Sequence, residues 1–324
     1  MAIQMRLGLG QFSEVTDDLM TFIRQLGVED IVLNSARLPG DERWEFMDLL
    51  NLRTTVENAG LRIGSLENVP HQFYDKVMLG LPGREEQIEN MAATIRNIGR
   101  AGIPILGYHW MPNRVWRSSL TTPGRGGVKV TRFDLELVKD APFSHDREYT
   151  EDELWDNYEY FMKRIIPVAE DAGVKLALHP DDPPVASLGG VGRCMRSFDG
   201  FKRAMEIGDS PMNGLNFCHG CWSEMKGGEG VLDAIRYFGG MGKIFYVHFR
   251  DVKGTAECFD ECFIDEGNNN MLEVVKTLKE VGFDSFMIPD HVPKVVDDSS
   301  WNHRGRAYAI GYMRALLEVV NSLP

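Results

Sequence analysis

The stretch EDELWDNYEYFMKRIIPVAEDAGVKLALHP, residues 151–180, shows the unit from which the chain is built. Its first part, 151–172, has apolar residues at helical spacing, which predicts an amphipathic helix. The pair Ala172-Gly173 follows, and a glycine at this point is typical of the residue just after a helix end. The next run, Val174–Pro180, is short and apolar, which predicts a buried strand. We therefore expect a helix followed by a strand.

The same alternation continues in both directions along the chain. Further Ala-Gly or Val-Gly pairs precede strands at Ala59-Gly60, Ala101-Gly102 and Val281-Gly282. The predicted strands are Met5–Gly10, Asp30–Asn34, Arg62–Asn68, Ile103–Trp110, Val174–Pro180, Leu215–Gly220, Ile244–Asp251 and Phe286–His291. The predicted helices are 17–27, 44–59, 85–101, 151–172, 197–207, 230–239, 269–281 and 305–321.

Eight strands, each followed by a helix, predict an α/β fold of the (β/α)₈ or TIM-barrel type, because parallel strands need crossover helices. An open doubly wound sheet also alternates. However, no Gly-x-Gly-x-x-Gly follows the first strand, and eight units with a terminal helix favour closure. A chain of 324 residues lies within the size range of one barrel, so we expect a single domain over 1–324.

The charge of the chain excludes some partners. The formal net charge is −13, which disfavours nucleic acid and anionic membrane surfaces. The segment Met1–Met20 contains Arg6, Glu14, Asp17 and Asp18 and does not resemble a signal peptide. No apolar run approaches the roughly 18 residues of a transmembrane helix. We therefore expect a cytoplasmic protein whose partner is a small molecule.

One connection departs from the alternation. The segment 113–150 lacks strong periodicity, and its first part, Asn113–Phe133, has five basic residues and no acidic one. These basic residues are Arg114, Arg117, Arg125, Lys129 and Arg132. In an acidic chain this reversal predicts a lid-like insertion that closes over an anionic substrate. The alternative is a mobile, solvated loop with chance composition.

Active sites of such barrels lie at the carboxyl ends of the strands, and the last four predicted strands end in metal-competent side chains. These side chains are His179, Cys218, His248 and Asp290, at separations of 39, 30 and 42 residues. Two imidazoles, a thiolate and a carboxylate suit a divalent ion such as Mn²⁺, Fe²⁺, Co²⁺ or Zn²⁺. A single histidine on a strand is more often an ordinary core residue, but four groups in register predict a metal site.

The five cysteines allow another interpretation. Their odd number and low density disfavour a disulfide scaffold. Cys218 and Cys221 have the spacing of a metal knuckle, and Cys258 and Cys262 can complete a structural zinc clip. That clip would take Cys218 away from the barrel mouth and leave the other three donors without a role. We therefore favour the site at the barrel mouth.

Several of these motifs resemble the mannonate dehydratase family of hexuronate catabolism. The segments that carry the resemblance are LHPDDPP (Leu178–Pro184), GLNFCHG (Gly214–Gly220), VHFRDVKG (Val247–Gly254), PDHVP (Pro289–Pro293), residues 79–103, and YHWMP (Tyr108–Pro112) followed by Trp116-Arg117. The resemblance implies a xylose-isomerase-like barrel, bound Mn²⁺ or Fe²⁺, dehydration of D-mannonate to 2-keto-3-deoxy-D-gluconate, and a homodimer. It also implies the same four metal ligands.

Other candidate residues lie close to these motifs. The family's acid or base histidine falls on His291, although this residue can also serve only to orient Asp290. The family also uses a tyrosine, for which Tyr308 is the nearest match, although Tyr308 can be an ordinary helix residue. Arg250 and Arg117 are candidates to pair with a substrate carboxylate. Asp181 and Asp182 can bind hydroxyls or orient ligands, or they can serve turn chemistry before Pro183-Pro184.

Two departures from the family concern the substrate. The chain is shorter than typical members, and Gly8–Phe12 lacks the expected aromatic pattern. Another sugar acid therefore stays open. A sugar isomerase or epimerase is a rival on the same barrel, but such enzymes use ligand sets richer in carboxylates than one with Cys218. A metal nuclease and a non-catalytic barrel with structural zinc are further alternatives, and the acidic charge disfavours the nuclease.

Overall fold

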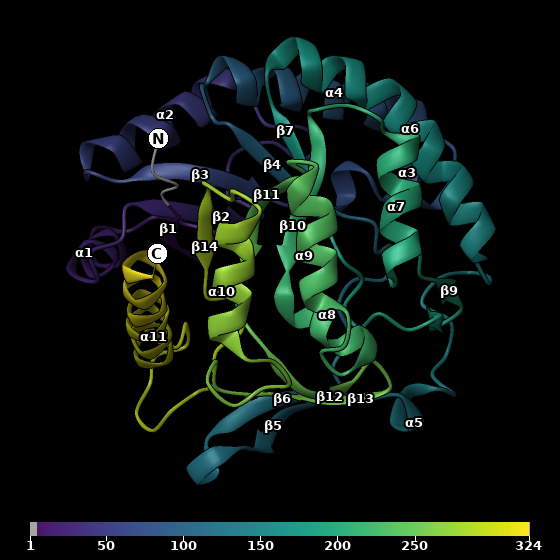
Figure 1. Ribbon diagram of the computed structural model, residues 1–324. Coiled ribbons are helices and arrows are strands. Elements are labelled where there is room, and N and C mark those ends of the chain that lie inside the picture. Colours follow the sequence, from purple (N-terminus) through teal and green to yellow (C-terminus); the bar gives the residue numbers. More distant parts are fainter. Residues whose placement is uncertain (1–4, 324) are drawn as a thin grey trace.

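The central feature of the computed structural model, which describes residues 5–323, is a closed barrel of eight parallel strands (Figure 1). Around the barrel their order is β1, β14, β11, β10, β7, β4, β3, β2. The strands are β1 (Arg6–Phe12), β2 (Asp30–Asn34), β3 (Arg62–Glu67), β4 (Ile105–His109), β7 (Lys175–His179), β10 (Asn213–Cys218), β11 (Ile244–His248) and β14 (Phe286–Ile288). The predicted TIM barrel is confirmed. The predicted domain limits, 1 and 324, lie outside the described residues.

Eight long helices surround the barrel at the predicted places (Figure 1). They are α1 (Asp17–Gln25), α2 (Phe46–Asn58), α4 (Arg84–Arg100), α6 (Glu151–Ala172), α7 (Phe198–Ile207), α9 (Val231–Gly240), α10 (Met271–Glu280) and α11 (His303–Ser322). Helix α6 begins at a capping box in which Thr150 and Glu153 satisfy each other's backbone N–H groups. It ends at Gly173, whose φ of 66° is the left-handed conformation expected there.

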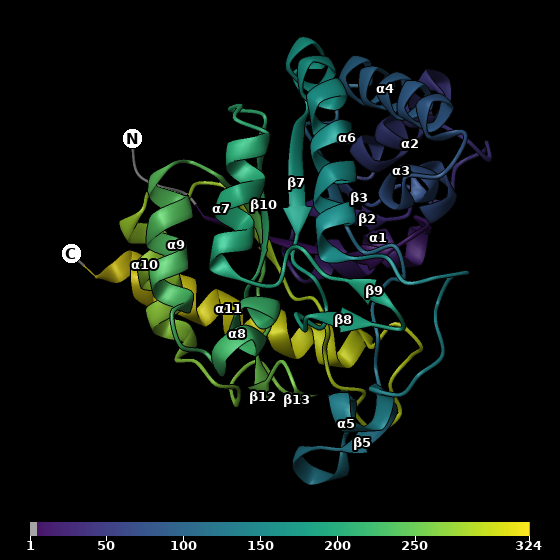
Figure 2. The same ribbon diagram turned by 90° about the vertical axis from the view of Figure 1, so that its right-hand side faces the viewer.

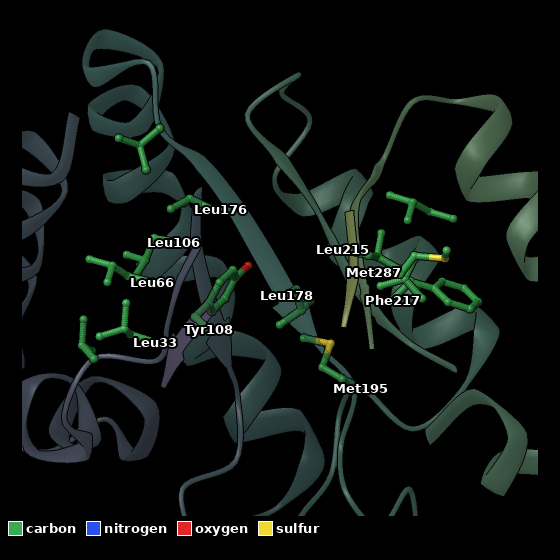
Figure 3. Packing of buried hydrophobic residues seen from close by; sticks show 14 of the residues in the cluster. Leu33, Leu66, Leu106, Tyr108, Leu176, Leu178, Met195, Leu215, Phe217 and Met287 are labelled. Atoms are coloured by element: carbon green, nitrogen blue, oxygen red, sulfur yellow. The ribbon is translucent and has the colours of Figure 1, made fainter. Parts of the chain in front are cut away.

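Successive side chains of each barrel strand point alternately into the barrel and toward the surrounding helices, so they belong to two separate hydrophobic cores. On β7, Leu176 and Leu178 pack with the surrounding helices, and both belong to the cluster drawn in Figure 3. Ala177 points the other way and packs with Val32 of β2 and Ile288 of β14 inside the barrel. The interior is therefore lined by every second residue of a strand, and His179 has the same parity as Ala177.

The insertion at 113–150 has more regular structure than its sequence indicates. It contains β5 (Ser119–Pro123), the 3₁₀ turn η2 (Arg125–Gly127), β6 (Lys129–Asp134) and α5 (Leu135–Val138). Strand β6 pairs with β13 (Cys258–Glu261), which pairs with β12 (Val252–Thr255), and the four strands form one antiparallel sheet. The partner strand is distant in sequence, so a local pattern does not reveal the pairing.

This sheet lies beyond the carboxyl ends of the barrel strands. Figure 2 shows the arrow of β7 pointing toward the side on which β5 and the small hairpin of β8 (Ser187–Leu188) and β9 (Val191–Gly192) lie. Short helices η1 (His71–Phe73), α3 (Asp75–Leu79) and α8 (His219–Lys226) were not expected. The predicted strand Leu215–Gly220 is corrected, because its last two residues begin α8. No helix within residues 5–323 is long and apolar enough to cross a membrane.

Candidate metal centre and cavity

Three of the predicted metal donors meet at the carboxyl end of the barrel. One ligand atom from each of His179, Cys218 and His248 lies within 4.8 Å of the others. Asp290 adjoins this group, with its Oδ2 atom 3.6 Å from His248 Nδ1 and 3.9 Å from Cys218 Sγ. Alternation explains the convergence, because His179, Cys218 and His248 are the last residues of their strands and point to the barrel interior. Asp290 lies two residues beyond the end of β14.

Each of the two imidazoles is held in its orientation by hydrogen bonds at one of its ring nitrogens. His248 Nε2 lies 2.8 Å from Glu67 Oε2 and 3.0 Å from Asn216 Nδ2. Its Nδ1 is buried and finds no hydrogen-bond partner among the described residues. His179 Nδ1 lies 2.7 Å from the carbonyl oxygen of Pro180, which leaves Nε2 as the ring nitrogen without a bond to the backbone. A histidine that gives one nitrogen to a carboxylate or carbonyl and presents the other is the arrangement of metal ligands.

The thiol of Cys218 is suited to lose its proton. Burial alone raises the pKa of a thiol. Here the hydrogen bond with Cys221 and the positive charges of Arg250 and His179 outweigh burial and hold the pKa of Cys218 well below its usual value. A thiolate is the form in which cysteine binds metals. The four donors therefore have the chemistry and the orientation to hold one divalent cation.

The donors open onto a cavity of about 460 Å³. His179, His248 and Asp290 line one part of its wall, together with Asp182 and His291. Eight polar lining residues belong to the first half of the barrel or its following loops: Gln11, Asn34, Ser35, Glu67, Asn68, His71, His109 and Arg114. Of these, the sequence prediction named as a candidate only Arg114, among the basic residues of the insertion. The rule that sites lie at strand ends also marks four of them, Gln11, Asn34, Glu67 and His109, but we applied it only to the last four strands.

The missed residues form a polar network that reaches the metal donors. Asn34 Nδ2 donates to Gln11 Oε1 at 2.6 Å, and Gln11 Nε2 donates to Glu67 Oε1 at 2.9 Å. Glu67 then holds His248. Burial alone raises the pKa of the Glu67 carboxyl, but the charge and hydrogen bond of His248 lower it below its usual value. Glu67 therefore holds its partner as a carboxylate.

The structure gives Arg250 a different place from the predicted one. Its guanidinium is buried and does not line the cavity. It donates to Asp290 at 2.8 Å, Glu261 at 3.0 Å, Glu224 at 3.1 Å and Asp182 at 3.2 Å, and it contacts Cys221 Sγ at 3.3 Å. Because its donors are already occupied by protein carboxylates, Arg250 is not free to pair with a substrate.

Arg117 also differs from the prediction. It lies outside the 460 Å³ cavity, and its guanidinium donates to Asp182 Oδ2 at 2.9 Å and to Glu261 Oε1 at 2.9 Å. Its side chain is 7% exposed. The arginine therefore anchors the insertion to the barrel and does not face the substrate side. Asp182 lines the cavity as predicted, whereas Asp181 is fully buried and accepts a hydrogen bond from the Met195 N–H.

The two predicted catalytic residues have contrasting positions. His291 lines the cavity, and its Nδ1 lies 2.7 Å from Glu261 Oε1. Burial alone lowers the pKa of an imidazole, but the carboxylates of Asp290 and Glu261 outweigh it and raise the pKa of His291. Tyr308 is 43% exposed, its ring packs against Phe263, and it does not line the cavity. The structure therefore does not bring Tyr308 to the wall of this cavity.

The zinc-clip alternative is not supported. The metal-competent groups within the described part of the chain contain neither Cys258 nor Cys262. A second buried group does exist, in which donor atoms of Asp182, Cys221 and Glu224 lie within 4.8 Å of one another. Arg250 Nη2 contacts all three of these residues. This second group already has its cation, supplied by the protein.

Comparisons with known proteins agree on one family. A family model described as D-mannonate dehydratase (UxuA) matches residues 5–145 and 141–323. The chain is 31% identical to a mannonate dehydratase from Thermotoga maritima, over 93% of each protein. It is 32% identical to one from Geobacillus thermodenitrificans, over 91% of this chain and 86% of the relative.

Solved structures extend the likeness to the fold. A crystal structure of mannonate dehydratase from Streptococcus suis matches with a TM-score of 0.87 and 30% identity, covering 98% of this chain and 93% of that one. A xylose isomerase domain protein from Planctomyces limnophilus matches at 13% identity with a TM-score of 0.64, over 99% of each chain. That weaker likeness shows the fold alone and confirms the xylose-isomerase-like barrel. By sequence and by structure, this chain belongs to the mannonate dehydratase family.

Proposed function

We propose that this chain is a metal-dependent hydro-lyase that converts D-mannonate to 2-keto-3-deoxy-D-gluconate and water. Family membership supports the reaction and the substrate class. The observation that carries the proposal is the buried, unpartnered Nδ1 of His248, which faces Asp290 beside Cys218 and His179 at the wall of a 460 Å³ cavity. A cavity of that size has room for a six-carbon acid.

The proposed cofactor is one Mn²⁺ or Fe²⁺ ion, held by His179, Cys218, His248 and Asp290. Imidazole, thiolate and carboxylate together suit a first-row divalent metal, and Zn²⁺ or Co²⁺ would also fit this set. When bound, the metal supplies Lewis acidity that stabilises the negative charge developing on the substrate. The chain prepares the site through Glu67 and the Pro180 carbonyl, which fix the two imidazoles before any metal arrives.

The reaction removes a proton from C2, beside the carboxylate, and releases the C3 hydroxyl as water. We assign one of these proton transfers to His291. Its Nδ1–H donates to Glu261, so its Nε2 is the atom available to take or give a proton. Glu261 is buried and itself held by Arg250 and Arg117, so it keeps the imidazole in one orientation. Glu261 is thus a positioning residue.

The activity test uses the purified chain, stripped of metal and reloaded anaerobically with Mn²⁺ or Fe²⁺. With D-mannonate we expect 2-keto-3-deoxy-D-gluconate only in the loaded samples and none after EDTA treatment. An isomer of unchanged mass would indicate an epimerase or isomerase. Turnover of a different aldonate, but not D-mannonate, would retain the dehydratase and correct its substrate.

Two cysteine variants test the metal site separately from the substrate. Cys218→Ser removes a proposed ligand, whereas Cys258→Ser changes a cysteine that lies outside the group of donors. We expect the first variant to lose stoichiometric metal and the second to retain it, as measured by elemental analysis. Equal metal content in the two variants would remove Cys218 from the ligand set.

A further inference from the structure

Within the part of the chain that the structure describes, the acidic residues that line the cavity are paired with protein groups, whereas the arginine that lines it is not. Three acidic residues line it, and each has a partner: Glu67 bonds to His248, Asp182 to Arg117, and Asp290 to Arg250. Arg114 is the only arginine or lysine among the lining residues that the structure describes. It enters the hydrogen bonds of residues 5–323 only through its backbone N–H and carbonyl. Arg114 is exposed, and among the described lining residues its guanidinium is the one arginine or lysine charge without a protein hydrogen-bond partner.

The backbone at Arg114 is held in an uncommon conformation. Its φ is 62°, in the left-handed region that is unfavourable for most residues with a side chain. Its N–H donates to the Met111 carbonyl at 3.0 Å, and its carbonyl accepts from Arg193 Nη2 at 2.8 Å. Arg193 is fully buried and pairs with Asp181, two residues beyond His179. This conformation is thus held from the segment that directly follows β7, the strand that ends in a proposed metal ligand. Such retained strain is common at ligand-binding sites.

Two histidines line the same cavity as Arg114 and lie within reach of its charge. The rings of His71 and His109 are stacked, with centroids 6.2 Å apart, and both line the cavity. Burial lowers the pKa of both imidazoles. The charge of Arg114 lowers the pKa of His71 further, whereas for His109 it adds a smaller effect after those of His71, His179 and Arg193. His109 Nδ1 accepts from the Met111 N–H at 3.2 Å. The proton of the neutral imidazole must then be on Nε2, which makes His109 a hydrogen-bond donor.

We propose that Arg114, with His71 and His109 beside it, forms the site that binds the carboxylate of the sugar-acid substrate. A guanidinium presents parallel N–H donors that match a carboxylate, and no protein carboxylate competes for them here. In this proposal Arg114 takes the role of binding the substrate carboxylate, for which the sequence had suggested Arg250 and Arg117. This assignment rests on the proposed function for the identity of the acid, but not for its charge.

The test compares a charged ligand with an uncharged one. Binding of D-mannonate and D-mannitol to the Mn²⁺-loaded protein is measured by calorimetry for the wild type, Arg114→Asn and Arg114→Lys. Asparagine tolerates the left-handed backbone, so the variant is expected to fold, and its thermal midpoint verifies this. Lys139→Gln removes an exposed positive charge of the same insertion, whose one ion pair within residues 5–323 is with Glu136, and serves as the matched control.

We expect Arg114→Asn to weaken D-mannonate binding by about 10- to 100-fold, with mannitol binding unchanged. Arg114→Lys should lie between, because an ammonium lacks the paired donors. In turnover, KM should rise while kcat changes little, as for a group that binds substrate and transition state alike. Lys139→Gln should match the wild type. Unchanged mannonate affinity in both Arg114 variants would overturn the assignment.

The binding readout separates this inference from the proposed function. If the wild type binds D-mannonate without forming product, the proposed reaction fails while the Arg114 assignment is still decided by the variants. If the wild type dehydrates D-mannonate and Arg114→Asn leaves KM unchanged, the assignment fails and the reaction stands. If the wild type binds neither D-mannonate, D-gluconate nor D-galactonate more tightly than mannitol, the carboxylate site is refuted.

Discussion

The two halves of the barrel contribute different chemistry to one cavity. Strands β7, β10, β11 and β14 lead into imidazole, thiolate and carboxylate donors that point at a common centre: His179, Cys218, His248 and Asp290. Strands β1 to β4 lead into Gln11, Asn34, Glu67 and His109, which bond to one another, to the donors or to backbone. The second half has the composition of a metal site, and the first half has that of a support and a substrate wall.

The contact through which the first half reaches a proposed metal donor is the bond between Glu67 and His248. It spans 181 residues in sequence, so the orientation of His248 depends on both halves. The comparison teaches that a ligand set is only part of a metal site, because the second nitrogen of each histidine must also be fixed. If the second half holds the metal and the first half supports it, variants in the two halves should differ in their effects, which are given from the largest to the smallest.

The largest effect concerns the buried arginine that holds the second half together. Arg250→Met leaves Asp182, Glu224 and Glu261 buried with fewer cationic partners, and breaking such buried pairs typically costs about 3–5 kcal/mol. Urea unfolding at neutral pH measures the loss. Arg236→Met, which removes an arginine from exposed pairs with Asp233 and Glu280, should cost less than about 1 kcal/mol. Similar costs would show that the buried cluster is not structural.

The next prediction compares two histidines that are aligned in the barrel. His109 of β4 is the register partner of His179 of β7. The two histidines therefore lie at the same height in the barrel, one in each half, and can be compared directly. His179→Gln should lose bound metal and reduce activity by more than the roughly 100-fold that supporting residues can cost. His109→Gln should keep one metal per chain. Metal loss in both variants, measured by elemental analysis, would break the division between the halves.

A smaller effect is expected from the residue that connects the halves. Glu67→Gln keeps the shape of the side chain but removes the charge that holds His248, and it should weaken Mn²⁺ affinity by about 10- to 100-fold. Competition with a chelator measures this affinity. Glu136→Gln, an exposed change of the same kind, is the control. Mn²⁺ affinity equal to that of the wild type would mean that Glu67 does not support the metal site.

The smallest effect concerns the sheet above the barrel, whose hairpins follow β4 and β11 and so come from both halves. Arg125 is half exposed and pairs with Asp265 at 2.7 Å across the two insertions. Arg125→Gln should lower stability by no more than about 1 kcal/mol, because exposed ion pairs contribute little. Thermal unfolding measures it, and turnover should be unchanged. A large loss of activity would instead make this clasp part of a working lid.

The sequence predicted much of the second half of the site for a local reason. A run such as Lys175–His179 contains both the pattern that makes a strand and the residue that ends it. Parallel strands in one barrel place their ends at one level, so spacing alone brings His179, Cys218 and His248 together. The same reasoning would have marked Glu67 and His109 at the ends of β3 and β4. The sequence therefore contained the signal for these two residues, namely their position at the ends of predicted strands.

Other features had no local signal. The strands β5 and β6 exist because β6 finds β13 more than 120 residues later, as in the pairing of Phe133 with Phe259. Sequence composition also could not rank the arginines. Arg117, Arg250 and Arg114 are alike as residues, and only their neighbours differ: buried carboxylates for the first two and an open cavity for the third.

By itself, the amino-acid sequence determined the barrel and its eight long helices and placed four proposed donors at strand ends, because periodicity and strand-end position are properties of the sequence. The tertiary structure alone decided which nitrogen of His248 is free, which arginine keeps an unpaired charge, and that Tyr308 lies away from the cavity. These outcomes depend on contacts between segments far apart in sequence. Burial and pairing set the charge and direction of a side chain, and both belong to the folded molecule.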